Sequence, residues 1–281
     1  MDFDYALGMR ATPEVESRFW VGCCEATTDT QDAGPGRAAV FTAASPLHPT
    51  RNEDGAAVFS LGDCAVIAVA DGVGGLPGGD AAAAHALEAL GSSLDEVRDT
   101  PDSRRVRDAL LDGFELGHAR IRDTDCGATT LACVELRPDS FRTYHAGDSA
   151  VLVIDRVGMI KQQTVPHSPV GYAMESGLID EDEALFHPKR NVIFKCLGRE
   201  HMGLELSMPS PLEPEDTVLV ASDGLLDNLT LAEIVDVLRD HDVTTAAKRL
   251  GELARQRMGT PVDPLKPSKP DDVTLAVYRP R

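Results

Sequence analysis

The sequence predicts an α+β fold built from antiparallel sheets. Short apolar runs rich in Val and Ile cluster toward both ends of the chain, with two helical segments between them. Two more helical segments precede the last run, which favours α+β over a regular alternation of strands and helices. The 281 residues are 42% hydrophobic and 26% charged, as in a globular protein that can bury a sizeable core without disulfides.

The first half of the chain contains two predicted strands and two predicted helices. We expect strands at 19–26 and at 64–70, where the run CAVIAVA is apolar throughout. Residues 29–50 are rich in Gly, Pro, Ala and Thr and are expected to form mostly loop. Residues 80–97 and 103–122 carry apolar side chains at helical spacing and are predicted helices.

The second half of the chain is richer in predicted strands. Five apolar runs are typical of strands: 129–136, 141–145, 150–155, 217–221 and 273–278. We expect the second and third of these to form a hairpin. Weaker strands are expected at 191–196 and 204–208, and a short helix near 180–186. Residues 231–239 and 243–257 have helical periodicity.

A single domain is expected over residues 19–281, preceded by a loosely ordered arm at 1–18. The first ten residues, MDFDYALGMR, are acidic and lack an apolar core, which argues against a signal peptide. No run of about 18 apolar residues is present to span a membrane. The six cysteines form no Cys-x-x-Cys pair and are expected to be reduced. These features together favour a cytoplasmic protein.

The charge balance excludes some classes of partner. Lys and Arg number 27 and Asp and Glu number 46, so the formal net charge is −19. This acidity argues against nucleic acid or an anionic membrane as a main partner, because both attract basic residues. It is compatible with a site that collects divalent cations.

Aspartates stand where several apolar runs begin or end. Asp71 and Asp223 directly follow predicted strands, Asp148 closely precedes one, and Asp271 and Asp272 precede the last. Since antiparallel strands begin beside the ends of their neighbours, these carboxylates can meet at one edge of the core. Clustered anions repel unless cations neutralise them, and oxygen ligands suit Mg²⁺ or Mn²⁺. Asp-Gly is also a common turn signal, so the pattern alone indicates only a candidate metal site.

Six segments resemble, in order, the motifs of the metal-dependent protein serine/threonine phosphatases of type 2C, the PPM family, in their bacterial-type form. They are RNED at 51–54, VADGVGG at 69–75, GATT at 127–130, GDSA at 147–150, ASDGLLD at 221–227 and PDDVT at 270–274. Parts of 167–191 resemble the mobile flap of bacterial-type members. The resemblance spans roughly 20–279. It implies a β-sandwich of two antiparallel sheets flanked by helices on both outer faces, a four-layer αββα arrangement.

The resemblance also implies a metal centre at one end of the sandwich, with two Mn²⁺ or Mg²⁺ ions. Asp71 would bridge the two ions, and the carbonyl of Gly72 would complete the protein ligands of the first. Asp223 and Asp271 would hold the second ion. Asp54 would hold metal-bound waters from the outer shell.

A weaker third ion is implied at Asp148, Asp223 and Asp227. The implied reaction is direct attack on phosphoserine or phosphothreonine by a hydroxide that bridges the two main ions, without a covalent phospho-enzyme. The expected partner is therefore a phosphorylated protein, with no nucleic acid and no membrane, and the chain is expected to act as a monomer.

Two departures from the family pattern leave alternatives open. Val73 stands where some members have a His that serves as a candidate general acid, and Pro49 stands where many have a phosphate-binding Arg. Arg51 is a candidate for phosphate binding, against an ordinary solvated Arg. A pseudophosphatase-type module that binds metal or a partner on the same fold is the main alternative, and a hydrolase of small phosphate esters is another. The intact set of metal-ligand aspartates favours an active phosphatase.

Overall fold

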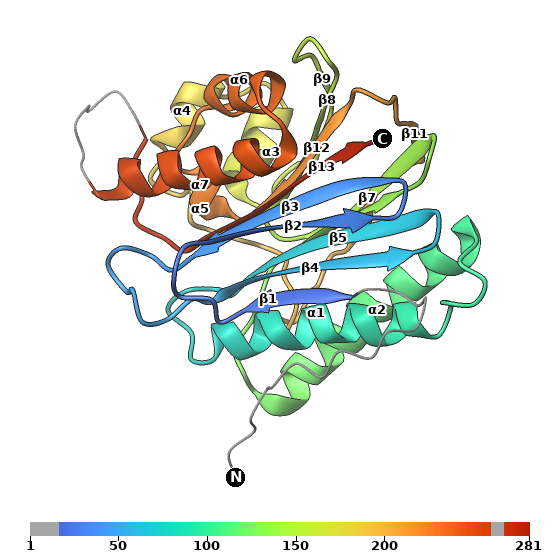
Figure 1. Ribbon diagram of the computed structural model, residues 1–281. Helices are drawn as coiled ribbons and strands as arrows, with labels where there is room; N and C mark the ends of the chain where they lie inside the picture. The colour runs from blue at the N-terminus through green and yellow to red at the C-terminus, as the bar shows by residue number, and fades with distance from the viewer. Residues whose placement is uncertain (1–16, 260–266) are drawn as a thin grey trace.

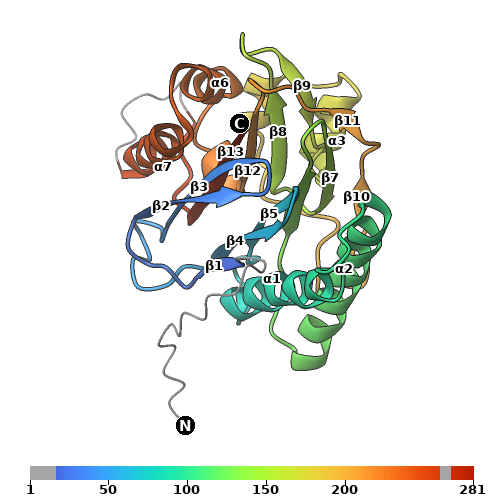
Figure 2. The ribbon, with the colours of Figure 1, turned by 45° about the vertical axis from the view of Figure 1, so that its right-hand side comes forward.

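Two antiparallel sheets pack face to face in the computed structural model, which describes residues 17–259 and 267–281. Helices cover the outer face of each sheet (Figure 1). The turned view separates the helices of the first sheet, α1 and α2, from α6 and α7 on the opposite side (Figure 2). The expected four-layer αββα arrangement is confirmed.

The first sheet has seven strands. In spatial order they are β1 (Arg18–Val21), β4 (Asp54–Leu61), β5 (Cys64–Asp71), β6 (Leu131–Leu136), β7 (Ser140–Ala146) and β10 (Glu205–Leu206), with β11 (Ser210–Pro211) also paired to β7. The helices α1 (Gly79–Asp95) and α2 (Ser103–Thr124) lie against this sheet. The side chain of Asp102 caps α2 by accepting hydrogen bonds from two backbone N–H groups of its first turn.

The second sheet has six strands. In spatial order they are β2 (Thr27–Ala33), β3 (Gly36–Ala43), β13 (Val273–Pro280), β12 (Thr217–Ala221), β8 (Ala150–Ile154) and β9 (Ile160–Gln163). Its helices are α5 (Asp223–Leu226), α6 (Leu231–Asp240) and α7 (Val243–Gly259). Two short helices, α3 (Pro169–Glu175) and α4 (Glu181–Leu185), lie in the segment between β9 and β10.

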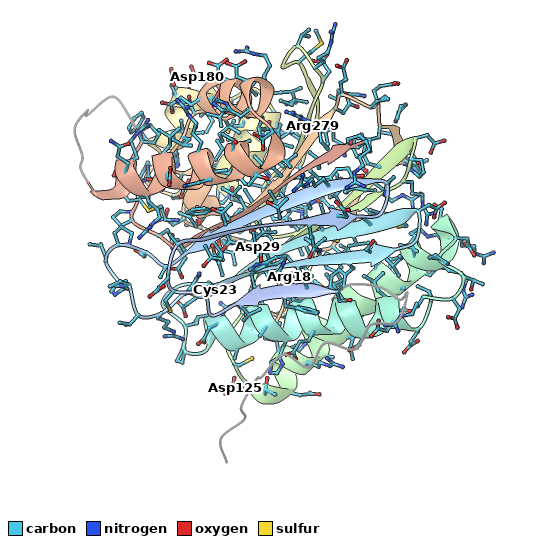
Figure 3. The ribbon with its side chains drawn as sticks, viewed as in Figure 1. Arg18, Cys23, Asp29, Asp125, Asp180 and Arg279 are labelled. Atoms are coloured by element: carbon cyan, nitrogen blue, oxygen red, sulfur yellow. The ribbon has the colours of Figure 1, made fainter. Side chains whose placement is uncertain are left out.

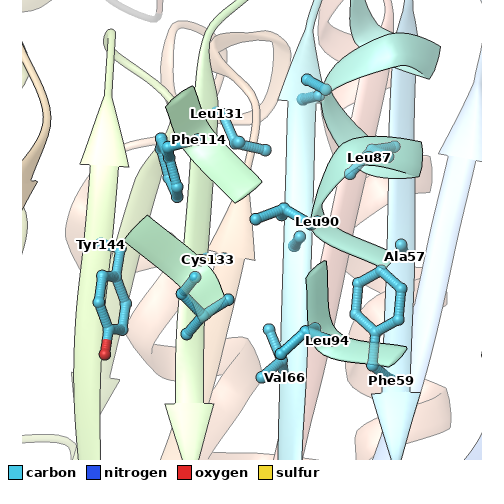
Figure 4. Close-up of a cluster of buried hydrophobic side chains, with 14 of the residues drawn as sticks. Ala57, Phe59, Val66, Leu87, Leu90, Leu94, Phe114, Leu131, Cys133 and Tyr144 are labelled. Carbon is cyan, nitrogen blue, oxygen red and sulfur yellow. The ribbon is translucent and has the colours of Figure 1, made fainter. Parts of the chain in front are cut away.

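Buried apolar side chains fill the spaces between the layers. Leu87, Leu90 and Phe114 of the two long helices pack with Phe59 and Val66 of the first sheet (Figure 4). Comparable clusters fill the space between the two sheets and the space under α6 and α7. Because each fully buried side chain of this size contributes about 1.5–3 kcal/mol, these layers fix the strand ends that carry the aspartates.

The loop expected over residues 29–50 is wrong, because most of β2 and all of β3 lie there. Strand β2 has the polar sequence TTDTQDA and pairs only with β3, at the edge of its sheet. Its side chains are mostly half-buried, so the strand shows none of the apolar patterning that marks a central strand. Gly34 turns the chain between the two strands with a φ of 49°. Strand β4 was also not anticipated.

The hairpin expected between 141–145 and 150–155 is also wrong. Strand β7 belongs to the first sheet and β8 to the second, so residues 147–149 carry the chain across the sandwich. Gly147 has a φ of 118°, and a Cβ there would lie 2.5 Å from Thr130 Cβ. The close approach of the start of β6 to the end of β7, together with the positive φ, therefore requires a glycine at the crossing.

Smaller differences concern the segment between the sheets. Residues 191–196 form no strand, and the strand expected at 204–208 is reduced to the two residues of β10. Helix α3 was not expected; it begins after Ser168, whose side chain accepts a hydrogen bond from the N–H of Gly171. The other expected helices and strands are present, with ends shifted by a few residues.

An ion pair joins the two sheets at their edges. Arg18 on β1 is paired with Asp29 on β2, and both are labelled in Figure 3. Most of the arm expected at residues 1–18 lies outside the described residues, which begin just before β1. Among the helices of the described ranges, none combines the length and the apolar character needed to cross a bilayer.

Candidate metal centre

The first two carboxylates of the site face each other across neighbouring strands. Asp71 is the last residue of β5 and Asp54 the first residue of β4, and the two are register partners. The backbone of Asp71 is held on both sides: its N–H donates to Thr130 Oγ1 at 3.2 Å, and its carbonyl accepts from the N–H of Thr130 and from Thr129 Oγ1, both at 2.8 Å. The GATT segment therefore fixes the position of Asp71.

The second sheet supplies the remaining carboxylates. Asp223 begins α5 directly after Ser222 at the end of β12, and Asp271 lies just before β13. Ser222 Oγ donates a hydrogen bond of 2.7 Å to Asp54 Oδ2, which connects the second sheet to the first. Asp148 lies on the crossing between β7 and β8. The structure thus brings together at one end of the sandwich the aspartates that the sequence places at strand ends.

Asp271 and its neighbour Asp272 have different partners. Both carboxylate oxygens of Asp272 accept hydrogen bonds from backbone N–H groups, of Ser45 at 2.7 Å and of Glu53 at 2.6 Å. Asp272 is thereby committed to holding the loop before β4. Asp271 Oδ2 instead lies 3.0 Å from the ammonium of Lys269, within the acidic cluster.

The carboxylates of the cluster raise one another's pKa values. Burial, and then repulsion from Asp54, raises the pKa of Asp71 well above its ordinary range. Burial, and then the charge of Asp272, does the same for the pKa of Asp54. Burial and repulsion from Asp223 raise the pKa of Asp148 to about 8. The protein's own positive groups therefore do not neutralise all the carboxylates here. A bound cation would reduce the remaining repulsion between them.

Lys269 is a charged residue of the site that the sequence analysis missed. Its Nζ lies 2.5 Å from Asp223 Oδ2, 2.9 Å from Asp227 Oδ2 and 3.0 Å from Asp271 Oδ2. Burial lowers the pKa of Lys269, but attraction by these three carboxylates outweighs burial and raises it overall. The lysine is therefore protonated. Its only sequence signal is its place two residues before Asp271.

The donor set fits hard divalent cations. All the side chains that converge, apart from Lys269, offer carboxylate or hydroxyl oxygen. Asp148 is 8% exposed, and its Oδ1 is buried without a hydrogen-bond partner. A buried carboxylate oxygen that lacks a donor is costly unless a cation completes its environment. Oxygen ligands of this kind suit Mg²⁺ or Mn²⁺.

The two Asp-Gly pairs are sites of close backbone approach. A Cβ on Gly72 would lie 2.5 Å from the carbonyl group of Gly79, and the Gly72 N–H donates to the Glu53 carbonyl at 3.1 Å. A Cβ on Gly224 would lie 1.7 Å from the carbonyl oxygen of Asp272. Neither pair sits in a plain surface turn, which was the alternative that the sequence left open.

Arg51 lies beside the site but is already paired. Its Nη2 lies 3.0 Å from Asp80 Oδ1 and 3.0 Å from Glu53 Oε1, and its side chain is 49% exposed. An incoming phosphate would have to compete with both carboxylates for this guanidinium. Its exposure leaves one face open to solvent.

A cavity of about 160 Å³ adjoins the carboxylates. It lies between the α3–α4 segment and the helices that follow β12. Its lining combines acidic residues of the site with apolar walls and one guanidinium: Asp148, Asp223 and Asp227, then Val170, Leu226 and Ile234, and Arg190. An apolar group of a ligand bound beside the aspartates could therefore contact apolar side chains in this cavity.

The family model for protein phosphatase 2C matches residues 48–256, which is well over half of the chain. The chain belongs to the protein phosphatase 2C family. The match includes Asp54, Asp71, Asp148, Asp223 and Asp227, whereas Asp271 and Lys269 lie beyond it.

Individual relatives agree with this assignment. The chain is similar to the serine/threonine phosphatase stp of Listeria welshimeri, with 26% identity over 196 residues, covering 67% of this chain and 77% of that protein. It is also similar to the solved serine/threonine phosphatase of S. agalactiae, with a TM-score of 0.74, 26% identity and coverage of 90% and 100%. The catalytic domain of the phosphatase PstP, solved with two manganese ions, has the same fold, with a TM-score of 0.68, 24% identity and coverage of 90% and 99%.

Proposed function

We propose that this member of the protein phosphatase 2C family hydrolyses phosphoserine and phosphothreonine in proteins with the help of two Mn²⁺ or Mg²⁺ ions. The observation that carries the proposal is the convergence of carboxylates from both sheets at one end of the sandwich, among them the buried Asp148, whose Oδ1 has no hydrogen-bond partner. The relatives named as serine/threonine phosphatases support the same reaction.

The proposed ligands of the two ions are Asp71, the carbonyl of Gly72, Asp223 and Asp271. Asp71 is the ligand proposed to serve both ions; in support, Asp54 on its own sheet and Asp223 beside the other sheet both act, after burial, to raise its pKa. Its backbone is fixed by Thr129 and Thr130, as described above. When bound, two such ions supply a water-derived nucleophile near neutral pH and positive charge for the phosphate oxygens.

The protein's own groups hold and orient this assembly. Asp54 is proposed to hold water molecules near the ions, and its carboxylate is oriented by the hydrogen bond from Ser222. Asp148 and Asp227, with Asp223, are the proposed ligands of a weaker third ion. Arg51 is the proposed phosphate contact, for which it would exchange one of its two carboxylate partners.

The test is release of inorganic phosphate from a phosphothreonine peptide with and without Mn²⁺. We expect release that requires Mn²⁺, is abolished by a chelator, and falls by at least about 10²-fold in Asp71→Asn, because a ligand of a two-ion centre is lost. Asp63→Asn, which removes an exposed acid from the loop between β4 and β5, is the matched control and should keep wild-type turnover.

The same assay separates the alternatives. A pseudophosphatase would bind Mn²⁺ without releasing phosphate from any substrate. A hydrolase of small phosphate esters would prefer such esters to phosphopeptides of equal concentration. Wild-type turnover in Asp71→Asn would overturn the proposed centre itself.

A further inference from the structure

The ammonium of Lys269 lies within the acidic cluster, in contact with three carboxylates that the proposed function assigns to metal ions. Asp223 and Asp271 are the proposed ligands of the second ion, and Asp223 and Asp227 belong to the third site. Lys269 Nζ lies within 3.0 Å of an oxygen of each. The Lys269 ammonium and a divalent ion would therefore compete for the same carboxylate oxygens.

Lys269 is held in this position by its own backbone. Its N–H donates to Asn228 Oδ1 at 2.8 Å, and its carbonyl accepts from Asn228 Nδ2, also at 2.8 Å. Asn228 is fully buried and donates a further hydrogen bond to the carbonyl of Gly224 on α5. The two hydrogen bonds between the Asn228 side-chain amide and the Lys269 backbone therefore hold the lysine close to α5, the helix that carries Asp223. The Lys269 side chain is only 16% exposed, so its contacts are not those of a loose surface lysine.

The oxygens of the cluster are unequally available to an incoming ion. Both oxygens of Asp271 are engaged, Oδ1 by the N–H of Asp272 at 2.9 Å and Oδ2 by Lys269. A metal ion at Asp271 therefore has to weaken or displace the lysine contact there. Asp227 belongs only to the proposed third site. Its Oδ2 lies 2.9 Å from Nζ and would keep the ammonium in place when Asp271 binds a metal ion.

We propose that Lys269 is a built-in monovalent cation that competes with the third divalent ion for its ligands and keeps that ion weakly bound. This inference rests on the proposed two-ion centre. The lysine neutralises Asp227 and part of Asp223, and it repels a further divalent ion from the pocket formed with Asp148. The centre is thereby limited to two tightly bound ions. Lys269 is a positioning residue, since it acts through the ligands and not on the substrate.

The test is Mn²⁺ binding, measured by equilibrium dialysis and titration calorimetry on the wild type and on Lys269→Met. We expect the wild type to bind two ions tightly. In Lys269→Met, a third ion should bind at least about 10-fold more tightly than in the wild type, because a positive charge a few ångströms away has been removed. Adding Asp227→Asn to Lys269→Met should return the protein to two ions, because the third site loses a ligand.

Two further variants keep the measurement decisive. Lys248→Met removes an exposed lysine on α7, which is paired with Glu252 at 3.8 Å, and should leave Mn²⁺ binding unchanged. If Lys269→Met fails to fold, Lys269→Gln takes its place, because its amide can still donate to the carboxylates without carrying a charge.

The outcomes distinguish the two proposals. If the wild type and the Lys269 variant bind the same number of ions with equal affinity, the role given to Lys269 is overturned while the two-ion centre stands. If neither protein binds Mn²⁺, the proposed function itself is overturned.

Discussion

Ser222 Oγ donates a 2.7 Å hydrogen bond to Asp54 Oδ2, which links the end of β12 in one sheet to the first residue of β4 in the other. Both residues are buried. Ser222 Oγ also accepts a hydrogen bond of 3.1 Å from the N–H of Thr274 on β13. One hydroxyl therefore fixes three strand ends at the candidate metal centre, and it offsets part of the effect of burial on the pKa of Asp54.

Replacing this hydroxyl should weaken both the fold and the reaction. In Ser222→Ala, the Thr274 N–H and the Asp54 carboxylate lose a partner while still buried, which costs about 1–3 kcal/mol of unfolding free energy. Phosphatase turnover should fall by about 10-fold or more, because a small displacement of a positioned group is enough to slow a reaction. Urea denaturation and initial rates measure the two effects. Ser92→Ala, at an exposed helix serine that donates to the Glu88 carbonyl, is the control; equal stability of the two variants would contradict this role.

Two metal-ligand variants should have opposite effects on the metal-free protein. Asp71→Asn removes a partly buried negative charge whose neighbours repel it, so the metal-free protein should become more stable. Asp223→Asn removes the nearest of the three carboxylates that contact the Lys269 ammonium and should destabilise the protein by about 1 kcal/mol, since Asp227 and Asp271 remain in contact with it. Thermal unfolding in the presence of a chelator measures both shifts.

The activity of these variants should change in one direction only. Both Asp71→Asn and Asp223→Asn should lose at least about 10²-fold of Mn²⁺-dependent turnover, because each removes a proposed ligand. If both variants shift the unfolding temperature of the metal-free protein in the same direction, the opposite electrostatic environments assigned to Asp71 and Asp223 are contradicted.

The aspartate cluster could be predicted because strand ends are visible in sequence. Runs such as CAVIAVA mark strands buried on both faces, and an aspartate at the end of such a run has a defined place in the sheet. The resemblance to a known family then gave the roles. Strand β2 could not be found in this way, since an edge strand with polar side chains carries no apolar pattern. The crossing at Gly147 looked like a hairpin because sequence alone does not show which sheet a strand joins.

Lys269 illustrates a second limit of sequence reasoning. It lies in a polar, proline-containing stretch, where a lysine is expected to be solvated. Its burial depends on Asn228, which is 41 residues away in sequence and clamps its backbone. Contacts of this range arise from the packing of α5 against the start of β13, so no local pattern indicates them.

The net charge of −19 should affect which substrates are used fastest. Acidic phosphopeptides are repelled over about a Debye length, roughly 10 Å at 0.1 M salt, whereas basic or neutral ones are not. At low ionic strength we expect a higher kcat/KM for basic or neutral peptides than for matched acidic peptides, with the difference shrinking as salt is added. Equal values at low salt would contradict this expectation.

Two buried histidines are stacked: His145 lies on β7 and His167 in the segment that follows β9. The rings of His145 and His167 stack with centroids 4.5 Å apart. His167 Nδ1 accepts a hydrogen bond of 3.1 Å from the N–H of Gly147, so its proton is on Nε2, which lies 3.0 Å from Glu205 Oε1. Lys195, 3.4 Å from the same carboxylate oxygen, adds a further positive charge nearby. Protonation of either ring would add a positive charge close to the Lys195 ammonium and is therefore disfavoured.

This pair should make the fold sensitive to acid. Burial, and then the proximity of His145, lowers the pKa of His167 to about 4, and burial also lowers the pKa of His145. In the unfolded chain these rings take up protons near their ordinary pKa of 6.5, so the unfolded state binds more protons below that pH. Stability should thus fall as the pH drops from 6.5 toward 4, by up to about 3 kcal/mol from His167 alone. Urea denaturation across this range measures the slope, which should be shallower in His167→Asn and unchanged in the control His85→Asn on α1; a slope unaltered in His167→Asn would contradict the assignment.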